Sequence, residues 1–249
     1  MKPITNRLFA PLAVLVASLP LLAMASPASA LSVAGQTPFC ANLPTTISTI
    51  NSNIASLTGK LNTAQSSRLS TLNDRWAKAD QTLTTSRAGW AAARQTQFAK
   101  LEAKATTDAQ KAAVTTFEST ITTAINTRES ANDAARATYR SGVTSLVNTK
   151  QSTTNGQVTT FTDAVNAAEA AATAGCQSSP SSATNRTTFQ AALKSARTTY
   201  SGDRTGDSNI ATQVKALAQT RDAAIAANDA TFKAAASAAE TALKAAFSS

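Results

Sequence analysis

The chain has no histidine, and it has no glycine-rich nucleotide-binding motif of the Gly-x-Gly-x-x-Gly or phosphate-loop type. Histidine is the commonest general base in proteins, so its absence excludes histidine-containing triads, zinc sites and phosphotransfer sites. The 14 acidic residues are scattered and lack the framework of the paired carboxylates used in glycoside hydrolysis. The sequence therefore predicts no catalytic residues and no cofactor, and the chain is not expected to be an enzyme.

Metal ligands are scarce as well. The best string of oxygen donors stands beside Gly206 and consists of Asp203, Thr205, Asp207 and Asn209. It departs from a calcium-binding loop because the glycine comes too early and an apolar residue stands where the bidentate glutamate belongs. Asp and Asn serve turns and helix caps well, so this string predicts a polar loop between helices and no metal site.

Bulky core residues are also few. Aromatic residues make up 5% of the chain, and much of the 43% hydrophobic fraction is alanine. Glycine and proline are rare after Pro44, while alanine, threonine and serine dominate. This composition is unusual for a compact globular core and is typical of long helices with a narrow apolar seam. It predicts an all-α fold.

The longest apolar stretch lies within residues 8–25, after the basic residues Lys2 and Arg7. It is short and interrupted by proline, and the small-x-small pattern of Ala28-Ser29-Ala30 follows it. These features predict a signal peptide over residues 1–30, cleaved after Ala30, and a secreted or extracytoplasmic location (periplasm or cell surface). No later run has the length of a membrane span.

The formal charge is +9, and it is +7 once Lys2 and Arg7 leave with the signal peptide. Basic residues are spread along the chain, as expected for a solvated helix surface. A preference for anionic polymers or surfaces explains the same excess. Basic patches interleaved with aromatic residues are missing, so no specific nucleic acid is expected as a partner.

Two apolar seams with helical spacing flank a candidate turn near Asp108. The first helix is expected to begin after Pro44, and its apolar residues recur at steps of three and four. Thr107 and Gln110 form a capping-box pattern, so a second helix is expected to start there and to stop at Gly175. If the two helices fold back antiparallel about Asp108, residue i faces residue 216 − i.

The two cysteines fit this arrangement. Cys40 falls opposite Cys176, and the two seams align within about a residue. In an oxidising compartment such a pair predicts one disulfide, with two free thiols or an intermolecular bridge as the alternatives. The predicted domains are an N-terminal extended segment at 31–43, a disulfide-closed long helical hairpin at 44–176, a linker at 177–182 and a third long helical segment at 183–249.

Together these segments predict an elongated, coiled-coil-like up-down-up bundle of three long helices, each roughly 90–100 Å long. Helices two and three each contain a stretch that favours a break, near 152–156 and 201–207. Four glycines belong to this cross-section of the bundle: Gly59, Gly156, Gly202 and Gly206. Surface kinks and a hinge both explain them.

Two further patterns recur along the chain. Residues 131–134 read Ala-Asn-Asp-Ala and residues 227–230 repeat them, although no named repeat is recognised. Trp76 and Trp90 lie two heptads apart on one helix face. Core packing is the default interpretation of both tryptophans, and an exposed aromatic binding patch is the alternative.

The stretch from Phe98 to Phe117, FAKLEAKATTDAQKAAVTTF, resembles uncharacterised secreted Ala/Thr-rich helical proteins of candidate-phylum, Saccharibacteria-type bacteria. The Phe39-Cys40 start and the ending from Leu243 to Phe247 share this resemblance. It implies a small host-dependent bacterium and a cell-surface or released location. It implies no activity.

These observations favour a secreted, non-catalytic structural or binding rod of the cell envelope or surface. Its expected partner is an anionic envelope polymer, a membrane surface or a neighbouring cell, and pairing into a homo-oligomer is left open. One alternative is an extracytoplasmic holdase chaperone with helical arms. Another is a membrane-active helical protein that opens to expose an apolar face.

Overall fold

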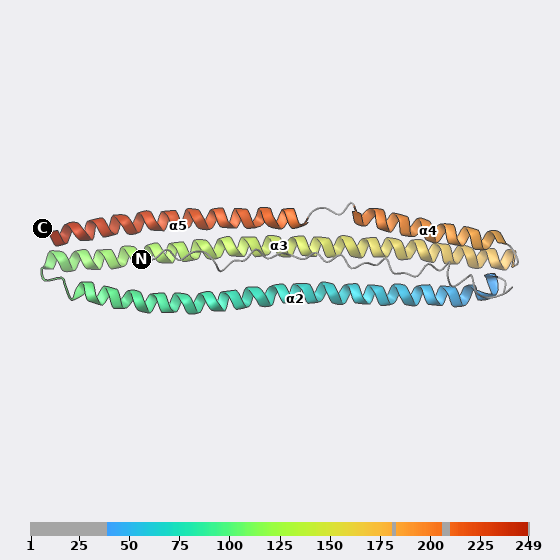
Figure 1. Ribbon diagram of the computed structural model, residues 1–249, viewed down its shortest axis with the longest axis horizontal. Helices are drawn as coiled ribbons and strands as arrows, with labels where there is room; N and C mark the ends of the chain where they lie inside the picture. The colour runs from blue at the N-terminus through green and yellow to red at the C-terminus, as the bar shows by residue number, and fades with distance from the viewer. Residues whose placement is uncertain (1–38, 181–182, 206–209, 249) are drawn as a thin grey trace. The chain divides into compact units, whose positions relative to one another are not determined.

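The computed structural model describes residues 39–180, 183–205 and 210–248, and its regular elements are all helices (Figure 1). Four helices follow one another, namely α2 Phe39–Glu102, α3 Asp108–Ser178, α4 Ala183–Thr205 and α5 Ile210–Ser248. The all-α prediction is confirmed. The predicted signal peptide at 1–30 lies outside the described residues, as do residues 31–38 of the predicted extended segment.

The helices divide into two compact units. The first, called the cysteine unit here, contains residues 39–66 of α2, residues 148–178 of α3, and α4. The second, called the turn unit, contains residues 67–102 of α2, residues 108–147 of α3, the turn between them and residues 212–248 of α5. Each unit thus combines two antiparallel segments of α2 and α3 with a helix from the C-terminal part of the chain.

The turn between α2 and α3 has the predicted capping box. The Gln110 backbone N–H donates to Thr107 Oγ1 at 3.2 Å, and the Thr107 N–H donates to Gln110 Oε1 at 3.3 Å. The Thr106 N–H donates to the same amide oxygen at 2.9 Å. These bonds satisfy backbone donors that a helix start leaves unpaired, and they fix where α3 begins.

The predicted start of the first helix was wrong. α2 begins at Phe39, so residues 39–43 are helical and not extended, and Pro44 lies inside the first turns. Proline lacks an N–H, but so close to the helix start it removes only one intrahelical bond. Leu43 is buried at 3% exposure in the core of the cysteine unit, and Cys40 is cross-linked. The packing of Leu43 and the cross-link at Cys40 therefore outweigh the tendency of Pro44 to interrupt the helix.

Two predicted interruptions of the second helix were also wrong. α3 runs without a break through 152–156 and continues past Gly175 to Ser178. A single glycine inside a helix costs about 1 kcal/mol, which tertiary packing overrides. By contrast, the third predicted segment is divided into α4 and α5. The gap includes Gly206 and adjoins the predicted break at 201–207, but residues 206–209 lie outside the described part of the chain.

The antiparallel register of α2 and α3 follows from their cross-helix contacts. The residue numbers add to 216, the predicted value, for the disulfide Cys40–Cys176 and for the ion pair Arg87–Glu129. They add to 220 for three hydrogen-bonded pairs: Asn51–Glu169, Gln65–Asn155 and Asp80–Arg140. Both sums occur within each unit, and a difference of four is one helical turn, so within each unit the two sets belong to one pairing of faces.

A separate apolar core lies in each unit. The cysteine unit has the larger cluster, to which all three of its helices contribute: Leu43, Ile54, Val165, Ala168, Ala172, Phe189, Leu193 and Ala196. Near the turn, Ala105, Val114 and Leu243 form a smaller cluster, packed against Phe117 and Leu101. The largest side chains that are fully buried are valines, as expected from the alanine-rich composition.

Candidate functional site

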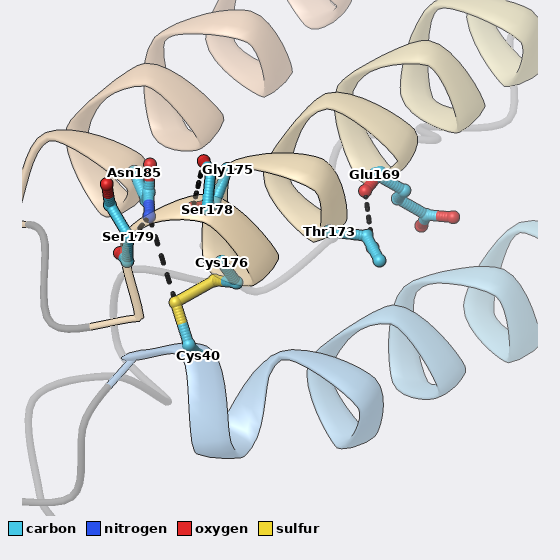
Figure 2. Close-up of a disulfide and its surroundings, with 8 residues drawn as sticks. All are labelled: Cys40, Glu169, Thr173, Gly175, Cys176, Ser178, Ser179 and Asn185. Carbon is cyan, nitrogen blue, oxygen red and sulfur yellow. Dashed lines mark hydrogen bonds between the residues drawn. A yellow bond between two sulfur atoms is a disulfide. The ribbon is translucent and has the colours of Figure 1, made fainter.

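The disulfide closes one end of the cysteine unit (Figure 2). It joins Cys40, near the start of α2, to Cys176, near the end of α3, with the two Cα atoms 5.4 Å apart. The sequence separation of the two cysteines is 136 residues. The chain contains no other cysteine, so the disulfide leaves no thiol for catalysis or metal binding.

The N-terminal turn of α4 packs against this disulfide. The Asn185 Nδ2 donates to the Ser179 carbonyl at 2.9 Å and lies 3.8 Å from Cys40 Sγ (Figure 2). A Cβ atom added to Gly175 would lie 2.6 Å from Asn185 Oδ1. A larger residue at this position would displace the Asn185 side chain, so Gly175 is explained by the packing of α4 against α3 and not by a helix stop.

A buried carboxylate lies in the same unit. Glu169 is 7% exposed, and its Oε2 accepts a hydrogen bond from Asn51 Nδ2 at 3.1 Å. The other carboxylate oxygen, Oε1, is buried and has no hydrogen-bond partner among the described residues. Burial raises the pKa of Glu169 above its ordinary value, and the bond from Asn51 opposes this only in part. A buried carboxylate with one unpaired oxygen costs stability, so Glu169 is interpreted as a packing residue.

The predicted glycine cross-section lies beside a cavity of about 230 Å³ in the cysteine unit. Gln157 and Asp203, which follow Gly156 and Gly202, are joined by a bond from Gln157 Nε2 to the Asp203 carbonyl at 3.1 Å. Small side chains line much of the cavity, together with the ring pair Phe161–Tyr200. No heavy atom lies within 4 Å of the Cβ position of Gly59, Gly156 or Gly202.

Gly59, Gly156 and Gly202 are therefore exposed positions whose Cβ sites face open space. The three described glycines stand inside helices, and the fourth member of the predicted set, Gly206, lies outside the described residues. The surroundings offer no group of three metal-ligating side chains anywhere in the described part of the chain. The absence of a metal site therefore stands as a prediction, and the polar side chains that line the cavity include Ser195, Tyr200 and Asp203.

Arginines dominate the interior electrostatics of the turn unit. Arg87 donates to both carboxylate oxygens of Asp133 at 2.8 Å, and its Nε lies 3.4 Å from Glu129. The guanidinium group holds the pKa of Asp133 below its ordinary value, and the carboxylate in turn raises the pKa of Arg87. Bidentate pairs of this kind fix the relative position of two helices, here α2 and α3.

Other arginines combine an ion pair with an aromatic ring. Arg128 lies 4.2 Å from the Phe232 ring centroid and 3.9 Å from Asp229. Arg221 lies 4.5 Å from the ring centroid of Tyr139. Guanidinium groups stack well on aromatic faces, so these contacts join α3 to α5 while neutralising the arginine charge.

Lysines behave differently. With the exception of Lys150, the described lysines are all exposed, namely Lys60, Lys78, Lys100, Lys104, Lys111, Lys194, Lys215, Lys233 and Lys244. Among these exposed lysines only two form an ion pair within the described residues, Lys111 with Asp108 and Lys244 with Glu240. Within the described residues the unpaired positive charge at the surface is therefore carried mainly by lysines, while arginines such as Arg87, Arg128 and Arg140 form ion pairs. This lysine surface is the candidate functional site.

One polar contact in the interior was missed by the sequence reasoning. Asn228 Nδ2 donates to Asn132 Oδ1 at 2.9 Å, and Asn132 is buried at 8% exposure. These residues occupy the same place in the two Ala-Asn-Asp-Ala segments, so the repeat marks where α3 and α5 meet. A buried asparagine pair specifies register, because a shifted helix would leave both amides unpaired.

The chain matches no protein-family model, and it matches no curated protein and no solved structure. None of the described helices is both long enough and apolar enough to cross a membrane. Function is therefore inferred from the chain's own surface and packing.

Proposed function

We propose that this protein is a secreted, non-catalytic structural or binding rod of the cell envelope or surface. It engages anionic surfaces through its exposed lysines. The observation that carries this proposal is the separation of the two kinds of basic residue. Arginines such as Arg87 and Arg140 are neutralised by carboxylates of the same unit, whereas most exposed lysines have no carboxylate beside them. Flexible lysine side chains at the surface suit non-specific attraction to phosphate- or carboxylate-bearing polymers.

The rod form is part of the proposal. An elongated up-down-up bundle would need α4 and α5 to follow α3 in one register. The residue numbers of contacting pairs support this, because they add to 360 for Gln157–Asp203 in the cysteine unit and for Tyr139–Arg221 in the turn unit. Small-angle scattering of the purified protein measures the shape. A compact profile would contradict the rod while leaving the lysine surface in place.

The test of function is co-sedimentation of the purified mature protein with isolated cell envelopes. Binding is expected at low salt and is expected to be lost at about 500 mM salt, where the Debye length is roughly 4 Å. A variant with glutamine at Lys100, Lys104, Lys215 and Lys233 should bind more weakly and depend less on salt. Binding that is unchanged at high salt would contradict the electrostatic mechanism.

The matched control keeps the net charge. Replacing Glu240 and Lys244 with glutamine removes an ion pair with a 2.6 Å contact and leaves the charge of the protein unchanged. Because both side chains are exposed, the fold should tolerate the change. This variant should bind like the wild type. If it loses binding as the lysine variant does, the effect belongs to local structure and not to charge.

A second candidate function is an extracytoplasmic holdase chaperone. It is favoured by the sparse core, in which many of the buried residues are alanines and valines, and by the open cavity beside Phe161. Helices packed so lightly could separate to grip an unfolded client. The protein should then suppress aggregation of a denatured client at stoichiometric ratios. Aggregation that proceeds at the same rate with and without the protein would exclude this function.

A further inference from the structure

In the turn unit, Trp76 contacts an arginine that is itself paired with a carboxylate. Arg140, on α3, lies 5.6 Å from the Trp76 ring centroid. Both of its terminal nitrogens donate to the carboxylate of Asp80 at 2.6 Å, and Asp80 stands one helical turn after the tryptophan. Ring, cation and anion are all supplied by the protein. The guanidinium group keeps the pKa of Asp80 below its ordinary value, so this anion persists at neutral pH.

The same residue spacing recurs two heptads further along α2, with different residues at two of the three positions. Moving fourteen residues forward along α2 and fourteen back along α3 replaces Trp76, Asp80 and Arg140 with Trp90, Arg94 and Asn126. Two heptads return a residue to nearly the same helix face, so the two sets are equivalent in place. In the second set a cation stands where the first has its carboxylate. The α3 position holds a neutral amide.

Two of the three residues of the second set, Trp90 and Arg94, are incompletely covered or paired. Trp90 is 45% exposed and is one of two large apolar side chains exposed in the described residues. The Nε of Arg94 is buried and has no hydrogen-bond partner among them. Around the tryptophan the sequence reads Ala88-Gly89-Trp90-Ala91-Ala92-Ala93, and no heavy atom lies within 4 Å of the Cβ position of Gly89. The residues one helical turn away on the same face include Arg87 and Arg94, and the indole ring remains 45% exposed.

We propose that Trp90 and Arg94 form the point at which this protein contacts an anionic phospholipid surface. The proposal rests on the proposed function and names the surface and the contact. A lipid phosphate supplies Arg94 with the anion that Asp80 supplies in the first set. The indole ring of Trp90 has an apolar body and a polar N–H, and such rings settle at the headgroup level of a bilayer.

A flat partner fits this surface better than a small anion does. A free phosphate would contact the guanidinium group but would leave the indole ring in water. An indole ring that is 45% exposed can contact a plane, and exposed lysines of the same unit add long-range attraction of about 1 kcal/mol each near an anionic leaflet. The contact is peripheral, consistent with the lack of a spanning helix among the described residues.

The experiment uses the whole mature protein with its disulfide intact and carries Trp76→Phe, so that Trp90 is the sole tryptophan. Vesicles of phosphatidylglycerol and phosphatidylcholine are compared with vesicles of phosphatidylcholine alone and with inorganic phosphate at the same phosphate concentration. Binding is measured by co-sedimentation, and the environment of Trp90 by its emission maximum. The emission should shift to the blue with the anionic vesicles only.

Three variants locate the contact. Trp90→Ala, measured by co-sedimentation, should weaken vesicle binding about tenfold or more, since burying an indole ring is worth more than about 1.4 kcal/mol. Arg94→Gln should weaken it about fivefold. The matched control is Lys78→Gln, which removes one exposed charge from α2 about a third of the way around the helix from Trp90. It should change binding less than twofold.

The outcomes separate this inference from the proposed function. Vesicle binding that leaves the Trp90 emission unchanged, or that survives Trp90→Ala and Arg94→Gln, overturns the contact but keeps the anionic-surface function. A shift caused by inorganic phosphate alone overturns the lipid assignment. Salt-sensitive binding to envelopes without any vesicle binding does the same and favours a wall polymer. Loss of binding to both envelopes and vesicles removes the inference and the proposed function together.

Discussion

The disulfide offers the sharpest test of how the cysteine unit is held together. Replacing Cys40 and Cys176 with serine removes the cross-link and leaves no thiol, because the chain has only these two cysteines. Serine is close to cysteine in size, so the local packing of α2 against α3 should change little. The expected effect is a large loss of free energy of unfolding, since the bond mainly restricts the unfolded chain.

The magnitude follows from the length of the closed loop. A separation of 136 residues corresponds to about 5 kcal/mol at 25 °C on the chain-entropy model. If the turn unit stays folded while the cysteine unit unfolds, residues 67–147 no longer lengthen the loop. The remaining loop of roughly 55 residues still gives about 4 kcal/mol, because the dependence on length is logarithmic. A loss of this size is a large part of the stability of an ordinary domain.

The assay is urea unfolding followed by two signals. Far-UV circular dichroism reports all helices, whereas tryptophan emission reports the turn unit alone, because Trp76 and Trp90 both belong to it. In the serine variant, a helical transition should move to lower urea and should precede the change in tryptophan emission. Wild-type protein in excess reductant should behave like the variant.

The result that refutes this reasoning is specific. A decrease below about 1 kcal/mol in the free energy of unfolding, with coincident transitions by both signals, would mean that the cross-link does not restrict the unfolded chain as the loop model requires. If reduced wild-type protein remained more stable than the serine variant, the substitutions would be acting through packing and not through the lost bond.

Three further predictions concern one or two residues each, and the change in stability is measured by urea unfolding. Glu169→Gln should stabilise the protein by about 1 kcal/mol or more at neutral pH, because it removes a buried charge whose raised pKa favours the protonated form. The folded pKa lies above the unfolded one, so the gain should vanish as pH falls below the ordinary glutamate value, and a gain independent of pH would contradict this cause. Gly59→Ala should stabilise the protein by about 0.5–1 kcal/mol because open space surrounds its Cβ position. Gly175→Ala should destabilise it because the added Cβ would lie 2.6 Å from Asn185 Oδ1. Equal effects of the two substitutions would contradict the packing described. Replacing both Asn132 and Asn228 with leucine should raise the free energy of unfolding but make the register of α3 and α5 less specific. The loss of register should appear as additional oligomers in sedimentation velocity. A variant that stays uniform would show that other contacts set the register.

Much of the fold could be predicted from local patterns. Apolar residues at steps of three and four indicated helices, and the Thr107–Gln110 capping box located the start of α3. The pairing of Cys40 with Cys176 followed from one fold-back point, because an antiparallel hairpin of two helices has a single free parameter, its register. Element boundaries were predicted less well, since Pro44 and Gly156 are local signals that packing overrides.

The candidate site was harder to predict. Composition gave the excess of positive charge, but it did not show that arginines are paired within the units while lysines remain at the surface. The repeated Ala-Asn-Asp-Ala segment was visible, yet its role depended on α5 lying antiparallel to α3. The role of each of these side chains depends on which residue of the neighbouring helix it contacts. That residue is distant in the sequence, so local patterns do not identify it.

The sequence by itself determined that this protein is helical and that its chain folds back to bring the two cysteines together. Helical period and residue spacing can both be read from the linear sequence. Only the tertiary structure decided which polar and aromatic groups have partners. Trp76 and Trp90 show the difference. The two tryptophans lie two heptads apart on the same face of α2. Arg140 from α3 lies over the ring of Trp76. The equivalent α3 position opposite Trp90 holds Asn126, and the Trp90 side chain is 45% exposed. The covering group comes from a residue far along the chain, and only the packed helices bring it there.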